Sequence, residues 1–470
     1  MTILPLTRRV MAGLGLAAWA LAGHAACGDE LTGLVVDKAQ ARAKAGAMPG
    51  GKSQEPGTAD NLPPEMQLQL VAREAVRRSA GAGAAALLAE AARFDEDQAR
   101  AALAPSVTLG GSLGPARSTY DGATLRSGLQ MQGTVAASGI LWDGGRTQAV
   151  IRYRQEMRDA ARFSAQATQE QVVLDALSAA LERNRYRNQA RVYQQYARKM
   201  ACLVEALDQI VAVDKGRASE LLQARKTQAQ AELARDGALA LSRQLEIRLQ
   251  RYVGDQGTVG EGLSGPLGQT MDTGEIIRLI ERSSELQLAR AQADGARNLA
   301  ESADASLRPQ LSWTANATRG AQGGVPNSSI QAGLSVSYNL FNGGADQSAA
   351  AAAARRAEAA RRQYDETLQT RTARAFEVQE LATSAFDRAR RYVDVLKDSE
   401  RVRTATFQQW SQLGKRSLFD VMAAEGDHFS LRVAYVNALY DGYQASAQLR
   451  SIGGGLLGWL NVGDGSGGVR

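Results

Sequence analysis

The sequence predicts an α+β membrane protein that combines amphipathic β-strands with very long α-helices. The stretch 330–340 alternates apolar and polar side chains without a break, which is the period of a β-strand with one apolar face. After Gly343-Gly344 the pattern becomes helical and meets neither glycine nor proline before Gly414. The same change from strand to helix follows Gly144-Gly145. We therefore expect two strand-to-helix junctions, an arrangement that few folds require.

Composition favours long, narrow helical interfaces over a compact core. The chain has 470 residues and is 44% hydrophobic, but only 5% of its residues are aromatic. A compact domain of this length normally contains more of the large side chains that fill a core. The formal net charge of +6 is small, and arginine is interspersed with acidic and amide residues. This pattern is typical of solvated helix faces and not of a nucleic-acid-binding surface.

Residues 1–25 have the three parts of a secretory signal peptide. Arg8 and Arg9 precede an uncharged run over 10–22, and small residues surround position 25. The run is too short to span a bilayer as a helix, and the residues around the two arginines fit a twin-arginine signal poorly. We expect Sec-type cleavage near Ala25, followed by an extended segment over 26–63 that contains three prolines.

The two cysteines are Cys27, at the expected mature N-terminus, and Cys202, far along a predicted helix. In an oxidising compartment such a pair can form a disulfide that holds the N-terminal segment against that helix. The alternatives are a lipid-modified Cys27 and two unpaired thiols. His24 argues against lipidation, because a lipoprotein signal usually carries a large aliphatic residue at that place.

The mature sequence contains an internal duplication. Pro105 corresponds to Pro309, Trp142 to Phe341 and Gly216 to Gly414, each at an offset of about 200 residues. We divide the chain into repeat 1 over 64–253, an equatorial connector over 254–274, repeat 2 over 275–453 and a C-terminal tail over 454–470. Each repeat is predicted to contain a helix, a β-hairpin, a long helix and a return helix.

In repeat 1 the first helix covers 65–104, with an interruption at Gly81 and Gly83, and ends at Pro105. The strands of the hairpin flank turn residues over 114–124. The long helix runs from Gly145 to about position 214, roughly 100 Å at 1.5 Å per residue, and a return helix covers 218–253. Apolar side chains at alternating spacings of three and four predict a coiled-coil seam on the long helix; they are Tyr193, Tyr196, Met200, Leu203, Leu207 and Ile210.

In repeat 2 the first helix covers 275–307, and its hairpin has strands over 310–317 and 330–340 around a loop over 320–329. The long helix extends to about 413 and the return helix to about 451. Four strands of about 10 residues have the length and alternation of membrane β-strands. A soluble sheet with one wet face is the alternative, but it does not explain why both hairpins continue into such long helices.

Four strands alone would leave two open edges in lipid, where unpaired backbone groups are costly. Other copies of the chain must therefore close the barrel. Three copies give a 12-stranded β-barrel with a polar lumen, which the long helices continue as an α-helical coiled-coil barrel.

The order of these elements resembles the TolC family of outer-membrane channels over essentially the whole mature chain. The most specific features are Leu340-Phe341-Asn342-Gly343-Gly344, its counterpart Leu141-Trp142-Asp143-Gly144-Gly145, and the run from Gly414 to Glu425, which is similar to the family's Gly-x-x-Ser/Thr-x-x-Asp-Val-Leu signature. The resemblance implies a homotrimer in the bacterial outer membrane that spans into the periplasm. Its partners would be outer-membrane lipid, a periplasmic adaptor (membrane fusion) protein and an inner-membrane ABC transporter or RND pump, with no cofactor.

The resemblance also implies the functional sites. The turns at the periplasmic tips would dock the adaptor, with Asp214, Lys215 and Gly216 in one repeat and Gly414 and Lys415 in the other. A periplasmic gate would use Asp420, Arg416, Glu220 and Arg217, although Ala423 stands where the best-known member has a second acid. The alternative is that these are ordinary solvated helix-end charges. The barrel-to-helix junctions are Trp142, Asp143, Gly144 and Gly145, and Phe341, Asn342, Gly343 and Gly344.

Three classes of function are open to such a chain: a passive export duct, an envelope enzyme and a coiled-coil spacer. His24 leaves with the signal peptide, and His428 has no cysteine or second histidine nearby in sequence, so we expect no zinc centre and no enzyme. A spacer would not need amphipathic strands. Two runs, Gly414-Lys-Arg-Ser-Leu-Phe-Asp and Gly216-Arg-Ala-Ser-Glu-Leu, look more like the type I secretion branch than the multidrug branch. We therefore expect export of a protein such as an adhesin or toxin, with small-molecule efflux as the alternative.

Overall fold

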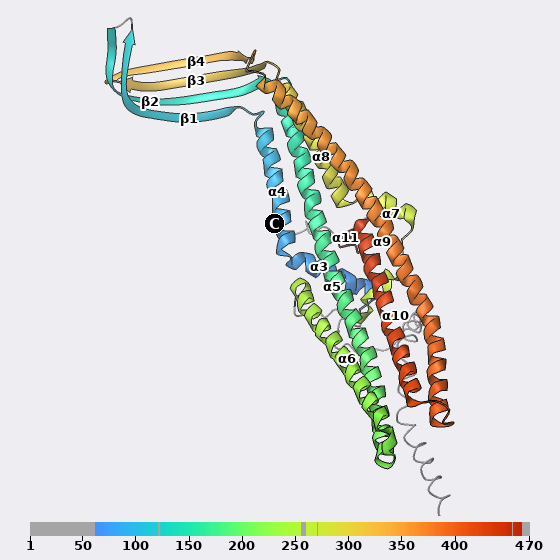
Figure 1. Cartoon of the computed structure of the whole chain (residues 1–470). Helices are drawn as coiled ribbons and strands as arrows, with labels where there is room; N and C mark the ends of the chain where they lie inside the picture. Colours follow the sequence, from blue (N-terminus) through green and yellow to red (C-terminus); the bar gives the residue numbers. More distant parts are fainter. Residues whose placement is uncertain (1–61, 121–122, 255–259, 270, 454, 463–470) are drawn as a thin grey trace, which may run out of the picture.

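The structure, a computed structural model, describes residues 62–120, 123–254, 260–269, 271–453 and 455–462. The predicted signal peptide, almost all of the N-terminal segment and most of the C-terminal tail lie outside the described residues. Figure 1 shows the strands gathered at one end of an elongated bundle of helices. Within the described residues, no helix combines the length and the apolarity needed to cross a membrane.

Both repeats fold into the expected order of elements. Repeat 1 contains α3 (Pro64–Arg78), α4 (Ala80–Ala101), β1 (Ser106–Tyr120), β2 (Ala123–Trp142), α5 (Arg146–Val213), a 3₁₀ turn (Lys215–Arg217) and α6 (Ala218–Val253). A 3₁₀ segment (Glu261–Gly268) precedes repeat 2, which contains α7 (Thr273–Ile280), α8 (Ser284–Ala305), β3 (Gln310–Gln322), β4 (Val325–Ser337), α9 (Ala345–Ser411) and α10 (Leu418–Ile452), before the short α11 (Leu456–Trp459).

The predicted hairpin turns are too long. β1 continues through Pro115 to Tyr120, and β3 and β4 are separated only by Gly323-Gly324, whose φ angles of 58° and 82° suit a two-residue turn. The predicted turn over 114–124 contains Pro115 and the predicted loop over 320–329 contains Pro326, and proline cannot donate to a strand ladder. Pro115 lies on β1 and Pro326 on β4, the two outer strands of the sheet, where proline is tolerated. β4 also ends three residues earlier than expected, at Ser337.

The predicted first helix of each repeat is two helices. In repeat 1 the break lies at Ser79 and not at Gly81 or Gly83, because the Ser79 hydroxyl accepts a hydrogen bond from the Ala82 N–H (3.1 Å) and caps α4. In repeat 2 the helix is interrupted between α7 and α8, and Ser283 is the N-cap residue of α8.

The four strands form one antiparallel sheet in the order β1-β2-β3-β4. The register aligns Leu109 with Val135, Val135 with Ala317, and Ala317 with Ile330, so one row of apolar side chains crosses all four strands. The neighbouring row, one residue along, contains Thr134, Thr318 and Ser329 on the opposite face. The sheet therefore has one apolar face and one polar face, as the sequence predicts.

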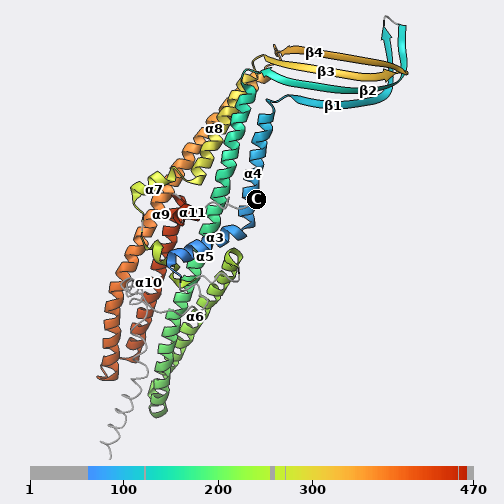
Figure 2. The same cartoon turned by 180° about the vertical axis from the view of Figure 1, so that it is seen from behind.

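α5 is the central helix of the bundle. Its half nearer the sheet packs between α4 and α8, and its other half packs against α6 and α10, whereas α9 contacts α8 and α10. The view from behind shows the same neighbours (Figure 2). The widest part of the bundle has a core in which α3, α5, α6 and α11 meet; it includes Leu68, Val71, Leu177, Leu249 and Leu456.

Candidate functional site

At the first junction, Asp143 caps the start of α5. Its carboxylate accepts hydrogen bonds from the N–H groups of Gly145 (3.1 Å) and Thr147 (2.7 Å), which are among the donors that a helix start leaves unpaired. Gly144 and Gly145 have φ angles of 66° and 90°, in the left-handed region where a Cβ is unfavourable. At this junction the sharp bend from strand to helix therefore combines two left-handed glycines with a side chain that accepts from the first N–H groups of the helix.

The second junction repeats this geometry. The Asn342 side-chain oxygen accepts from the Asp346 N–H (3.5 Å), four residues on, as Asp143 does from Thr147. Gly343 and Gly344 have φ angles of 70° and 84°. Phe341 is 85% exposed and Trp142 is 52% exposed, so both predicted aromatic residues project from the end of the sheet. Aromatic side chains favour the boundary between a bilayer and water.

Sequence reasoning missed the contact that connects the two repeats here. Arg308, three residues after the end of α8, donates to the Gly144 carbonyl oxygen (3.0 Å) and pairs with Asp304 (3.1 Å). Gly144 lies 164 positions away in sequence, so no local pattern predicts the contact.

Substitution at the first junction gives a prediction with a control of opposite sign. Gly145→Ala is expected to destabilise the protein by about 1–2 kcal/mol, because the left-handed backbone brings the new Cβ close to a carbonyl oxygen. Gly237 lies inside α6 with open space around it, and Gly237→Ala is expected to stabilise by up to about 1 kcal/mol. Thermal unfolding in detergent measures both shifts. Two shifts of the same sign would contradict the prediction.

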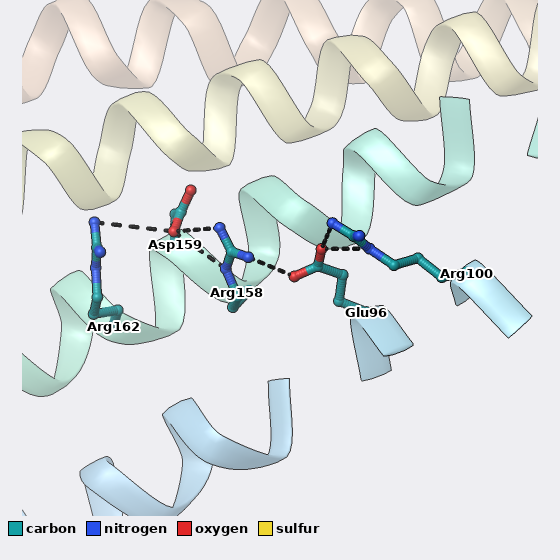
Figure 3. Close-up of polar contacts among 5 residues, drawn as sticks. All are labelled: Glu96, Arg100, Arg158, Asp159 and Arg162. Atoms are coloured by element: carbon teal, nitrogen blue, oxygen red, sulfur yellow. Dashed lines mark hydrogen bonds and ion pairs between the residues drawn. The ribbon is translucent and has the colours of Figure 1, made fainter. Parts of the chain in front are cut away.

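A charged cluster holds α4 against α5 on the helical side of this junction (Figure 3). Glu96, only 3% exposed, accepts from Arg100 (2.8 Å from Nε) and pairs with Arg158 of α5 (2.7 Å). Arg158 also pairs with Asp159 (3.1 Å), which lies 3.9 Å from Arg162. Oε1 of Glu96 accepts from Arg100 on α4 and Oε2 accepts from Arg158 on α5, so the carboxylate connects the two helices.

The Glu96 carboxylate predicts a pH dependence. Burial raises the pKa of Glu96, but its hydrogen bonds and the charges of Arg100 and Arg158 outweigh burial and hold the pKa below its usual value. A depressed folded-state pKa contributes stability that is present above the unfolded-state pKa and is lost as pH falls through the folded-state pKa. Glu96→Gln is therefore expected to lower the melting temperature at pH 7, with the difference from wild type shrinking as the pH falls through the lowered pKa of Glu96. A difference that is constant with pH would contradict this.

The predicted tip residues of repeat 1 interact with one another. Asp214 accepts from the Gly216 N–H (3.0 Å) and so closes the turn between α5 and α6. Arg217 pairs with Glu220 three residues on (3.2 Å). Lys215 and Gly216 are exposed within the turn.

The predicted tip residues of repeat 2 are also engaged within their own turn. Gly414 has a φ of 59°, and Arg416 donates to the Gln409 side chain (3.2 Å). Asp420 forms a capping box with Ser417, accepting from its N–H (3.0 Å), while the Ser417 hydroxyl accepts from the Asp420 N–H (3.2 Å). The hydrogen bonds that Asp420 accepts from the backbone and side chain of Ser417 hold the pKa of Asp420 below its ordinary value. Lys415 is exposed.

Near the tips, the helix pair of repeat 1 (α5 and α6) contacts the helix pair of repeat 2 (α9 and α10) through apolar side chains. Leu203 and Leu207 of α5 and Leu221 of α6 pack in one cluster with Leu418, Val421 and Met422 of α10. Of the ion pairs that join described residues, none connects Arg217 or Glu220 with Arg416 or Asp420. Within one chain the four predicted gate residues therefore form two separate groups.

A buried charged cluster, which the sequence analysis missed, lies next to this contact on the side toward the sheet. Glu425 of α10, 1% exposed, accepts from Arg403 of α9 (3.2 Å) and lies 3.8 Å from Lys199 of α5. Arg403 also pairs with Glu400 (2.5 Å), which lies 3.5 Å from His428. Burial raises the pKa of Glu425 against the opposing effect of Arg403 and Lys199. The five residues connect three helices.

His428 has a structural place in that cluster. Burial, reinforced by Arg403, lowers the pKa of His428 to about 4, so the imidazole is neutral at neutral pH and its contact with Glu400 is not an ion pair there. Its Nδ1 lies 3.3 Å from the Ser399 hydroxyl. Across the described parts of the chain, no group of three or more His, Cys, Asp or Glu residues could hold a metal ion.

The predicted disulfide stays a prediction. Cys202 lies on α5, whereas Cys27 lies outside the described residues, so the structure describes only one of the two partners.

Comparisons with known proteins identify the fold. A comparison with curated proteins gives no match. Among solved structures, the chain is similar to a membrane protein from Pseudomonas aeruginosa (17% identity, 86% of this chain and 99% of the other, TM-score 0.74). It is also similar to the outer membrane protein VceC from Vibrio cholerae (18%, 83% and 96%, 0.73) and the CmeC outer membrane channel from Campylobacter jejuni (16%, 87% and 90%, 0.71). At these identities the likeness shows the fold alone.

A family model described as outer membrane efflux protein matches residues 71–255 and 276–455, which correspond to the two repeats. These segments contain both hairpins, both Gly-Gly junctions and both helical tips. The resemblance to TolC-like channels is confirmed, and the chain belongs to the outer membrane efflux protein family.

Proposed function

We propose that three copies of this outer-membrane channel protein form the exit duct of a tripartite export system. The observation that carries the proposal is the apolar face of the sheet, where Leu109 is 83% exposed, Ile330 is 86% exposed and Leu334 is 72% exposed in the single chain. Such a surface is stable when hydrocarbon covers it. The polar face then lines an aqueous lumen.

The edges of the sheet support assembly from several copies. β1 and β4 each pair with one neighbour within the chain, and an edge left open in lipid costs several kcal/mol for each unpaired backbone group. Pairing β1 of one copy with β4 of the next closes the sheet, and three copies give a barrel of twelve strands. The helices continue this barrel toward the periplasm.

The tips complete the proposed mechanism. An adaptor would dock on the exposed turns around Lys215-Gly216 and Gly414-Lys415, and an inner-membrane transporter would supply the energy. Asp420 and Arg416, with Glu220 and Arg217, would face their counterparts on neighbouring copies and restrict the entrance. A ring of like charges in a narrow pore repels itself, which favours opening once a partner holds the helices apart. The duct itself is passive and performs no catalysis.

Purified protein in detergent and in planar bilayers tests this proposal. We expect a heat-resistant trimer and a defined single-channel conductance. A monomer without conductance would refute the duct.

For the cargo we propose a secreted protein, on the similarity of the turn over 414–420 to the type I secretion branch. Small-molecule efflux is the second candidate, and the description of the matched family favours it. Deletion of the gene separates the two. Loss of a protein from the secretome with normal drug susceptibility supports secretion, whereas an unchanged secretome with drug hypersensitivity would assign the duct to efflux.

A further inference from the structure

The polar face of the sheet is free of charge wherever all four strands are paired. This band comprises 106–114 of β1, 130–140 of β2, 310–322 of β3 and 325–337 of β4, and the structure describes every side chain in it. The polar face of the band consists mainly of hydroxyl, amide and glycine positions, among them Ser106, Thr108, Ser112, Gln130, Gln132, Thr134, Ser138, Thr314, Asn316, Thr318, Gln331 and Ser335. Neither an acid nor a base lies on this face of the band.

These polar side chains hydrogen-bond to one another along and across the strands. Gln130 donates to Gln132 (2.7 Å), Thr134 and Thr318 lie 3.5 Å apart on neighbouring strands, and the hydroxyls of Ser106 and Ser138 lie 2.9 Å apart. The wall thus offers dipoles that can exchange hydrogen bonds with water. It presents no fixed charge that could hold an ion.

Charged residues are common elsewhere in the chain, so the overall composition does not explain why the polar face of the band is uncharged. The one charged residue of the band, Arg319, lies on the apolar face, in register with Gly133 and Ser328. The helices have many charges, including the clusters around Glu96 and Glu425. The polar face of the band is therefore uncharged although 22% of the residues of the chain are charged.

We propose that the membrane section of the duct does not select among permeating ions or cargo molecules by their charge. The inference rests on the proposed function, because the polar face lines the lumen only in a closed barrel. In a water-filled pore, ion preference arises from rings of fixed charge on the wall. Because the band carries no such ring, we expect selection by charge to take place outside it, and hydrated cargo of either sign to pass the band on equal terms.

An isosteric change introduces the missing charge. Asn316 lies on β3, in register with Ala136 and Gln331 of its two neighbouring strands. Asn316→Asp places three negative charges on one ring of the trimer without altering side-chain shape. We expect it to raise the K⁺/Cl⁻ permeability ratio by about twofold or more, and Asn316→Lys to lower the ratio similarly, because each charge acts on ions in the same lumen. Reversal potentials in a KCl gradient measure the ratio.

Asn316→Gln is the matched control and should leave the ratio at the wild-type value. If Asn316→Asp and Asn316→Lys form conducting trimers but keep the wild-type ratio, charge on this wall does not govern permeation and the inference is overturned. If wild-type protein forms no trimer and no channel, the proposed function itself fails. The wild-type measurement therefore distinguishes the two failures.

Discussion

Leu109→Arg is expected to abolish assembly of the trimer in the outer membrane, whereas Thr108→Arg, one residue away, is expected to be tolerated. Leu109 lies in the apolar row that crosses all four strands, and Thr108 lies on the opposite face. Arginine on the lipid face of a barrel costs about 2–4 kcal/mol near the bilayer centre. Three copies would bring the cost to roughly 6–12 kcal/mol per trimer, comparable with the whole stability of a protein domain.

The amount of heat-resistant trimer in outer-membrane fractions is the measurement. The two variants add the same side chain to neighbouring positions of one strand, so a general effect of arginine on expression would reduce both. Equal losses, or a greater loss for Thr108→Arg, would show that the apolar face is not the one that meets lipid.

The sequence was sufficient to predict which face of each strand is apolar, because alternation over a strand depends only on the period of two. The strand ends were less predictable. Pro115 and Pro326 are typical loop residues, and only the position of β1 and β4 at the edges of the sheet explains why they fit within strands. Edge positions depend on sheet order, which no local pattern contains.

The junctions were predictable for a similar reason. Asp143 and Asn342 cap their helices through residues only two to four positions away, and left-handed glycines have a clear sequence signature. Arg308 and Glu425 could not be found in this way. Arg308 reaches Gly144 at the junction before α5, and Glu425 reaches Arg403 of α9 and Lys199 of α5. These contacts depend on how elements distant in sequence pack, which is set by the fold as a whole.

Glu425→Gln is expected to be among the most destabilising changes in the helical section. It removes one charge from a buried cluster and leaves Arg403 and Lys199 without that partner. Loss of one member of a buried ion pair typically costs about 3–5 kcal/mol, because the remaining charge stays buried. α5 and α10 would also lose a polar connection directly above their apolar contact, so we expect the closed channel to conduct more often.

Glu358→Gln is the control, because Glu358 pairs with Arg355 and Arg362 on an exposed face of α9, where ion pairs contribute little to stability. Thermal unfolding and single-channel open probability should change for Glu425→Gln and stay near wild type for Glu358→Gln. Stability lost without any change in open probability would show that the cluster supports folding only. Because the cluster joins α5 of repeat 1 to α9 and α10 of repeat 2, a change in both quantities would instead show that the gate depends on how the two repeats are held together above the tips.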